Sequence, residues 1–144
     1  MGRFYRDKVV AADVELGDRS AGTRVPATKV VRATLAELNA GKVIVPGVAG
    51  RQIVVTDAKM RAIGGALGAV TLIRLVESTS SGVVLSNTQA TATQDTWLNA
   101  NTANAVSTKM AVALTAGEGV KLDKTGNAGT VATHIDVVVT YYLA

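Results

Sequence analysis

The segment from Val131 to Tyr142 alternates apolar and polar side chains, and this pattern constrains the fold more than any other feature of the chain. Apolar residues occupy every second position, with Thr133 as the one polar exception: Val131, Ile135, Val137, Val139 and Tyr141. A period of two places one set of side chains on a buried face and the other on a wet face, as in an antiparallel strand. The chain is therefore predicted to end in a β-strand that packs on a core.

Shorter segments of the same kind come before it, separated by turns that contain glycine. The expected strands cover residues 41–47, 50–63, 70–77, 83–85, 106–114, 117–123 and 131–142. Residues 124–129 are predicted to form a turn, and the polar stretch 86–104 a long surface loop or a weak strand. Thr34 and Glu37 have the spacing of a capping box before Gly41, so a single helical turn and a continued strand both remain open there.

This pattern predicts an all-β fold, an antiparallel jelly-roll-like sandwich of about seven or eight strands. The 144 residues suit one domain. Residues 1–28 show no sustained period and contain several glycines and Pro26, so we expect an extended N-terminal arm over 1–28 and a β-sandwich domain over 29–144. The composition is 48% hydrophobic but only 3% aromatic, so aliphatic side chains must fill the core.

The net charge of +4 is concentrated toward the N-terminus, where three basic residues fall within the first eight. A basic leading segment is compatible with an acidic protein surface, with nucleic acid, or with simple solvation. Nucleic acid is not expected as a partner, because aromatic residues are too few for a stacking platform. No signal peptide and no membrane-spanning run is recognised, and cysteine is absent. We therefore expect a soluble protein made in a reducing cytoplasm.

A search for catalytic or metal-binding residues finds little. His134 is the single histidine, with Asp136 two residues on, and a metal site would need further ligands. No G-x-S-x-G nucleophile motif accompanies it. Gly64, Gly65 and Gly68 do not form a phosphate-binding G-x-G-x-x-G and are interpreted as a tight turn. We predict no catalytic residue, no metal ligand and no cofactor, and hence a protein that is not an enzyme.

Trp97 is the only tryptophan and lies in a polar neighbourhood. It is either an anchor of a contact surface, since tryptophan is enriched in interface hot spots, or a plug beneath a long loop.

Three segments of the chain resemble a known protein family. The first runs from residue 34 to 57 and contains N-A-G-K-V-I-V-P and G-R-Q-I-V-V-T-D; the second is G-E-G-V from residue 117; the third, residues 126–141, contains T-H-I-D-V-V-V-T-Y. These motifs, together with the Gly-Gly turn, resemble the small head decoration (cement) proteins of tailed bacteriophages. The likeness covers about residues 29–144 and leaves the first 28 aside.

This resemblance implies a structural β-domain, usually a homotrimer, on the outer surface of the virion head. There it would bridge neighbouring major capsid protein subunits and stabilise the shell, without nucleic acid or a membrane as partner. The capsid contacts would then come from aromatic and basic residues of the arm, and Trp97 would lie at the subunit interface. The expected contact residues are Arg3, Phe4, Tyr5, Arg6, Arg19 and Arg24. A phage tail or fibre domain and a carbohydrate-binding jelly-roll module are the alternatives.

Overall fold

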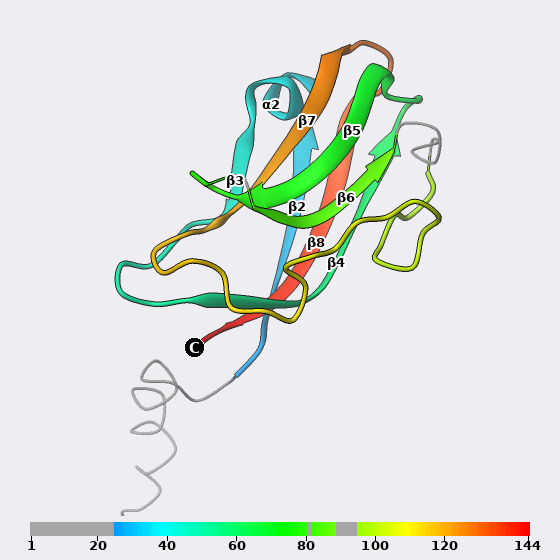
Figure 1. Ribbon diagram of the computed structural model, residues 1–144. Helices are drawn as coiled ribbons and strands as arrows, with labels where there is room; N and C mark the ends of the chain where they lie inside the picture. The colour runs from blue at the N-terminus through cyan, green and yellow to red at the C-terminus, as the bar shows by residue number, and fades with distance from the viewer. Residues whose placement is uncertain (1–24, 81, 89–94) are drawn as a thin grey trace, which may run out of the picture.

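The structure is a computed structural model that describes residues 25–80, 82–88 and 95–144. In these residues the chain forms strands and one short helix (Figure 1). In chain order they are β2 (Ala27–Thr34), α2 (Leu35–Ala40), β3 (Lys42–Val45), β4 (Ile53–Ile63), β5 (Gly68–Glu77), β6 (Val83–Thr88), β7 (Val120–Gly129) and β8 (His134–Leu143). The arm predicted over residues 1–28 lies outside the described residues up to residue 24, and residues 27 and 28 belong to β2.

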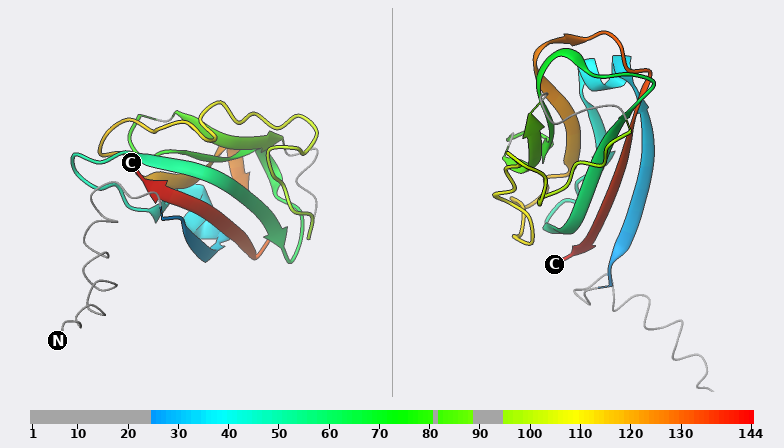
Figure 2. Two further views of the ribbon diagram at one scale, coloured as in Figure 1. Left: turned by 90° about the horizontal axis from the view of Figure 1, so that it is seen from below. Right: turned by 90° about the vertical axis from the view of Figure 1, so that its right-hand side faces the viewer.

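The strands form a three-stranded sheet, β2-β8-β4, and a four-stranded sheet, β3-β7-β5-β6. All the pairings between these strands are antiparallel. The first four strands alternate between the sheets, and the last two insert into the centre of each, as in a jelly roll. Figure 2 shows the two sheets as facing layers. The predicted all-β sandwich is therefore confirmed.

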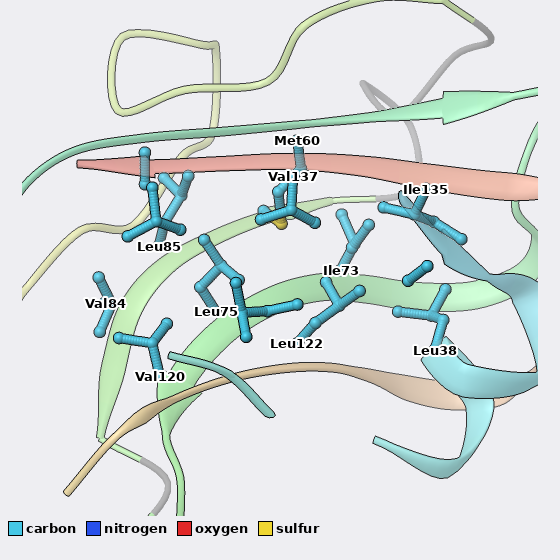
Figure 3. Close-up of a cluster of buried hydrophobic side chains, with 14 of the residues drawn as sticks. Leu38, Met60, Ile73, Leu75, Val84, Leu85, Val120, Leu122, Ile135 and Val137 are labelled. Carbon is cyan, nitrogen blue, oxygen red and sulfur yellow. The ribbon is translucent and has the colours of Figure 1, made fainter. Parts of the chain in front are cut away.

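The core lies between the two sheets and is aliphatic. Ile135 and Val137 of β8 and Met60 of β4 point toward Ile73 and Leu122 of the opposite sheet (Figure 3). Each of these five side chains is fully buried. Ile135, Val137 and Val139 fill the buried face that the alternation predicted, and burial of such a side chain stabilises the fold by about 1.5–3 kcal/mol.

The structure resolves the alternatives at residue 34 in favour of a helical turn. The Thr34 hydroxyl accepts a hydrogen bond from the Glu37 amide at 3.1 Å, and the Glu37 carboxylate accepts one from the Thr34 amide at 2.9 Å. This capping box begins α2, whose Leu38 is buried between the sheets. Gly41, with φ of 87°, ends the helix in a conformation that favours glycine.

The strand predicted over residues 106–114 is wrong. In this segment β-pairing is limited to two isolated bridges, Val106 with Ser86 of β6 and Ala113 with Val54 of β4, and no strand forms. Ala111 has a positive φ of 60°, which interrupts an extended chain. The segment thus crosses from one sheet to the other along one side of the sandwich, and it still places Leu114 in the core.

Two further boundaries differ from the prediction. Residues 124–129 continue β7 instead of forming a turn, with register shifts against β5 near Gly126. At the other boundary, Val131 is 56% exposed and β8 begins only at His134. The residues just before β8 lie beside the Gly64–Gly65 turn in space. There the Thr133 amide donates a hydrogen bond to the Ile63 carbonyl at 2.8 Å.

Candidate functional site: the outer face of the three-stranded sheet

The outer face of the three-stranded sheet carries a row of charged side chains that crosses all three strands. Arg32 of β2 and Arg61 of β4 both pair in register with Asp136 of β8, which lies between them. The neighbours of Asp136 along the strand, Ile135 and Val137, point into the core, so Asp136 points outward. The register of the sheet therefore brings together three residues that are far apart in the sequence.

Both arginines hold the Asp136 carboxylate. Arg32 donates from Nε to Oδ1 at 2.7 Å and from Nη2 to Oδ2 at 3.0 Å, a bidentate pair. Arg61 donates from Nε and Nη2 to Oδ2, each at 3.2 Å. The hydrogen bonds from Arg32, aided by those from Arg61, hold the pKa of Asp136 below its ordinary value. The carboxylate therefore stays ionised, and its oxygens are occupied by donors rather than available as a base.

Trp97 completes this surface beyond the edge of β4. The Arg61 guanidinium carbon and the Lys59 ammonium nitrogen each lie 4.5 Å from the centre of the indole ring. These distances suit cation–π contacts, which hold the ring and both cations in place.

The position of Trp97 follows from its neighbour in the chain. Leu98 exchanges backbone hydrogen bonds with Met60 at 2.7 and 3.0 Å, and its side chain is buried in the core. Leu98 therefore takes the core position, and Trp97 lies half-buried on the outer face. Of the two interpretations of Trp97, the plug beneath a loop does not fit this placement. Its place at a subunit interface stays a prediction.

The same face has an apolar component. Val30 of β2 pairs in register with Val138 of β8, which in turn pairs with Lys59 of β4. Val30 is 71% exposed, more than any other large hydrophobic residue in the described part of the chain. Three cations, Arg32, Lys59 and Arg61, and two carboxylates, Asp57 and Asp136, lie on this face, so it is apolar at its centre and has a small net positive charge.

A second polar cluster, at one end of the sandwich, contains two carboxylates. Glu77, at the end of β5, is 1% exposed and accepts hydrogen bonds from the Thr115 amide at 2.7 Å, from Lys109 Nζ at 3.1 Å and from the Ser80 hydroxyl. Burial alone would raise the pKa of Glu77, but the hydrogen bonds from Ser80, Thr115 and Lys109 outweigh burial and lower it to about 2.

Glu118 fills a matching role in the neighbouring turn. It accepts hydrogen bonds from the Thr79 amide at 2.7 Å, from the Ser80 amide at 3.2 Å and from the Thr79 hydroxyl. The hydrogen bonds from Thr79 lower the pKa of Glu118, although the nearby charge of Glu77 acts the other way. A catalytic acid needs a raised pKa near neutrality, so this pair is suited to fastening the turn after β5 to the chain before β7.

His134 and the predicted arm contacts are placed as follows. His134 Nδ1 lies 3.1 Å from the Thr133 hydroxyl, beside the Gly64–Gly65 turn. Within the described ranges, no group of three or more His, Asp or Glu is placed to hold a metal ion. The predicted capsid contacts lie outside the described residues: Arg3, Phe4, Tyr5, Arg6, Arg19 and Arg24.

Sequence reasoning missed the roles of Lys59, Arg61 and Arg32. A usable signal was present in β4, where the run Asp-Ala-Lys-Met-Arg-Ala places charges and apolar residues in strict alternation. That alternation indicates a charged outer face, but it does not reveal which strand lies beside it.

In the part of the chain that the structure describes, no helix has the length and apolarity needed to cross a membrane.

Comparisons with known proteins give the following. No protein-family model matches the chain, and no curated protein matches it in sequence. Among solved structures, the chain is similar to one in the acidic stable capsid structure of Helicobacter pylori bacteriophage KHP30, with 10% identity and a TM-score of 0.48 over 83% of this chain and 91% of that chain. It is also similar to one in the cyanophage Pam1 capsid asymmetric unit, with 16% identity and a TM-score of 0.49 over 83% of this chain and 84% of that chain. Both come from phage capsids, but identities and TM-scores this low leave the function to be argued from the residues of this chain.

Proposed function

We propose that this protein is a structural component of a tailed-phage head, a decoration (cement) protein that binds the outer surface of the shell. It bridges neighbouring major capsid subunits, it works without a cofactor, and it is not an enzyme. The proposal includes assembly as a homotrimer, which rests on the family resemblance alone. The observation that carries the proposal is the outer face of the three-stranded sheet, on which Trp97, Arg61 and Val30 are held ready for contact.

The composition of this face suits protein binding. Tryptophan and arginine are the residue types most enriched in interface hot spots, and here they are stacked on each other. Arg61 is fixed on its other side by Asp136, so its side chain has lost much of its rotamer freedom before any partner arrives. A preorganised side chain adds affinity because less conformational entropy is lost on binding.

The family resemblance supports the same conclusion, because the segments that carry it include part of the candidate face. Residues 34–57 supply α2, β3 and the first part of β4, and residues 126–141 supply the end of β7 and most of β8. These segments contribute strands to both sheets and supply most of β8, the central strand of the candidate face. A shell offers many equivalent sites, so modest contacts on several subunits add through avidity.

The proposal is tested by co-sedimentation of the purified full chain with heads of its parent phage that lack the protein. We expect saturation at a fixed multiple of the three-fold positions of the shell. Failure to pellet with expanded heads would reject the proposal and favour the tail or glycan-binding alternatives.

The face itself is tested with Trp97→Ala, for which we expect at least ~10-fold weaker binding to heads. Folding should persist, because Leu98 holds the core position. Val112→Ala is the matched control, since Val112 is 51% exposed in the crossing segment and not on the sheet. Equal binding by Trp97→Ala and wild type would remove this face from the account.

A further inference from the structure

Two of the outer sheet edges are covered by other segments of the same chain. At the edge of β4, Leu98 exchanges backbone hydrogen bonds with Met60 at 2.7 and 3.0 Å. At the edge of β6, Val106 exchanges backbone hydrogen bonds with Ser86 at 2.8 and 3.0 Å. A covered edge does not template pairing with another protein, so this chain protects its edges with its own residues.

The strand β2 forms a third edge, at the margin of the sheet β2-β8-β4 (Figure 1). It has eight residues in unbroken register with β8, from Ala27 to Thr34. Half of the backbone amides and carbonyls of such a strand point away from its partner. Among the described residues, no strand pairs with this side of β2. Residues 1–24, which come just before it in the chain, lie outside the described residues.

The two cations of β2 lie on opposite faces of the sheet. Arg32 pairs in register with Asp136 and belongs to the outer face. Lys29 pairs with Val139, which is buried in the core, so Lys29 lies on the inner side of the sheet. It is exposed there, and no ion pair joins it to another described residue. A strand added to β2 would therefore meet one positive charge on each face, three positions apart.

The sequence before β2 contains two acidic residues with this same spacing. The acidic residues there are Asp7, Asp13, Glu15 and Asp18, and only Glu15 and Asp18 are three positions apart. Among antiparallel registers of residues 1–24 on β2, a single one therefore sets an acidic residue opposite each cation: Glu15 opposite Arg32, and Asp18 opposite Lys29. Opposite charges in such positions stabilise a strand pair. A parallel strand would need a crossover of about a dozen residues, which residues 19–26 cannot supply.

This register also keeps apolar side chains on the inner side of the sheet. Leu16 falls opposite Val31, which is partly buried and packs against the core. Val14 falls opposite Ala33, which is buried. A shift of the register by one residue would turn Glu15 toward the core and Leu16 outward. The apolar pattern and the charges thus select the same register.

Arg32 is able to bind a second carboxylate. Its Nε and Nη2 atoms hold Asp136, its side chain is 57% exposed, and Nη1 takes no part in that pair. A guanidinium group carries five N–H donors, so donors remain for Glu15. The charged row of the outer face would then alternate in sign from Glu15 through Arg32 and Asp136 to Arg61.

The connection between the two strands is long enough. Residues 19–28 would join Asp18 to Lys29, and they contain Gly22 and Pro26, which favour turns. Ten extended residues span ~30 Å, whereas neighbouring strands lie about 4.8 Å apart. A short tether gives the segment an effective concentration of about 1 mM or more at its own β2, which favours it over the same segment of a second copy.

We propose that residues 13–18 add to β2 of the same chain as an antiparallel strand, with Glu15 opposite Arg32 and Asp18 opposite Lys29. The edge of β2 is then covered by the chain itself, like the edges of β4 and β6. For the proposed function, this means that the residues before 13, which include the predicted capsid contacts in residues 3–6, extend from the end of the outer face where β2 ends and β8 begins.

The first test is a disulfide between engineered cysteines, since the chain has no cysteine of its own. Gly17→Cys with Val30→Cys joins two positions that are directly opposite in the proposed register, within disulfide reach. Gly17→Cys with Val43→Cys is the matched control, because Val43 is also an exposed valine on an edge strand, but in the other sheet. We expect the first pair to form a disulfide within one chain at least ~10-fold faster than the control pair, as measured by mass spectrometry.

The other outcomes of this experiment overturn the inference. Equal rates for the two pairs, or no disulfide in the first pair, would mean that the segment does not lie along β2. Disulfide-linked dimers of the first pair would mean that the segment adds to a second copy. The experiment needs no phage heads, so its failure would leave the proposed function standing.

A charge exchange in the first cysteine pair tests the register. Lys29→Asp would set two carboxylates opposite each other, and we expect disulfide formation to slow ~2–5-fold. Adding Asp18→Lys reverses the pair and should restore the rate. Lys29 is exposed, so circular dichroism of both variants should match that of the parent pair. An unchanged rate with Lys29→Asp, or no restoration by Asp18→Lys, would contradict the proposed register.

Discussion

Replacement of the Glu77 carboxylate by an amide tests how much the hydrogen bonds to Glu77, at one end of the sandwich, contribute to the stability of the fold. In Glu77→Gln the shape of the side chain is kept, but the charge is lost and one oxygen becomes an NH₂ donor. That donor would face the Thr115 amide, Lys109 or Ser80, all of which donate to Glu77 in the wild type. In the variant, a hydrogen-bond donor therefore faces another donor at a residue that is 1% exposed.

The size of the effect follows from the pKa of Glu77. The ordinary value of 4.5 falls to about 2 in the folded state. A shift of this size corresponds to at most about 3 kcal/mol of stability at neutral pH. Lys109 is partly exposed, so solvent screens the pair, and we expect a loss of ~2 kcal/mol on substitution.

The effect depends on pH with a definite sign. The folded-state pKa of Glu77 lies below that of the unfolded chain, so between these values the unfolded state binds more protons. The stabilisation is fully present above pH 4.5 and is lost as the pH falls toward about 2. The difference in free energy of unfolding between wild type and Glu77→Gln should therefore be largest at pH 7 and should nearly vanish at about pH 2.

The assay is urea unfolding of both proteins from pH 7 to pH 2, followed by circular dichroism. Asp57→Asn is the matched control, because Asp57 is exposed on β4, and we expect it to differ from wild type by less than ~0.5 kcal/mol. Equal stability of Glu77→Gln and wild type at pH 7, or a gap that stays constant down to pH 2, would refute this reasoning.

Three further substitutions test other parts of the structure. Gly119→Ala should destabilise the fold by more than ~2 kcal/mol in thermal unfolding, because its added Cβ would lie 2.2 Å from the Val45 carbonyl oxygen; a wild-type melting temperature would contradict that close approach. Asn87→Leu should stabilise the fold by ~1 kcal/mol, since Asn87 is 0% exposed and neither polar atom of its side chain has a hydrogen-bond partner among the described residues; a loss of stability would show that the amide is needed. Asp136→Asn should cost ~1–3 kcal/mol in urea unfolding by leaving Arg32 and Arg61 without their carboxylate, and a neutral result would mean that these pairs add no stability.

The strands that could be predicted are those whose sequence carries a local signal. The alternation in β4 and in β8 from Ile135 onward follows directly from one buried face, and the capping box at Thr34 is a contact within four residues. The turn predicted over residues 124–129 was wrong because glycine and asparagine are typical of turns and also of bulged strands. Gly126, with φ of 82°, lies in a bulged strand. The strand predicted over residues 106–114 was wrong because an alternating pattern does not show whether a neighbouring strand is available for pairing.

The candidate face could be predicted only in part. The outward charges of β4 are readable from alternation, but the pairing of Arg32 with Asp136 joins residues 104 positions apart. Such a contact depends on the order β2-β8-β4, which no local pattern encodes. Trp97 shows the same limit, because its outward position is set by the backbone bonds of Leu98 to Met60.

The central claim is that this protein binds the outside of a phage head through the three-stranded sheet. Cryo-electron microscopy of parent-phage heads with and without the protein tests it most directly. The account predicts added density for a β-sandwich on the outer surface where capsid subunits meet, with Trp97 and β2 against the shell. Heads that show no added density, or density that contacts the shell only through the four-stranded sheet, would contradict it.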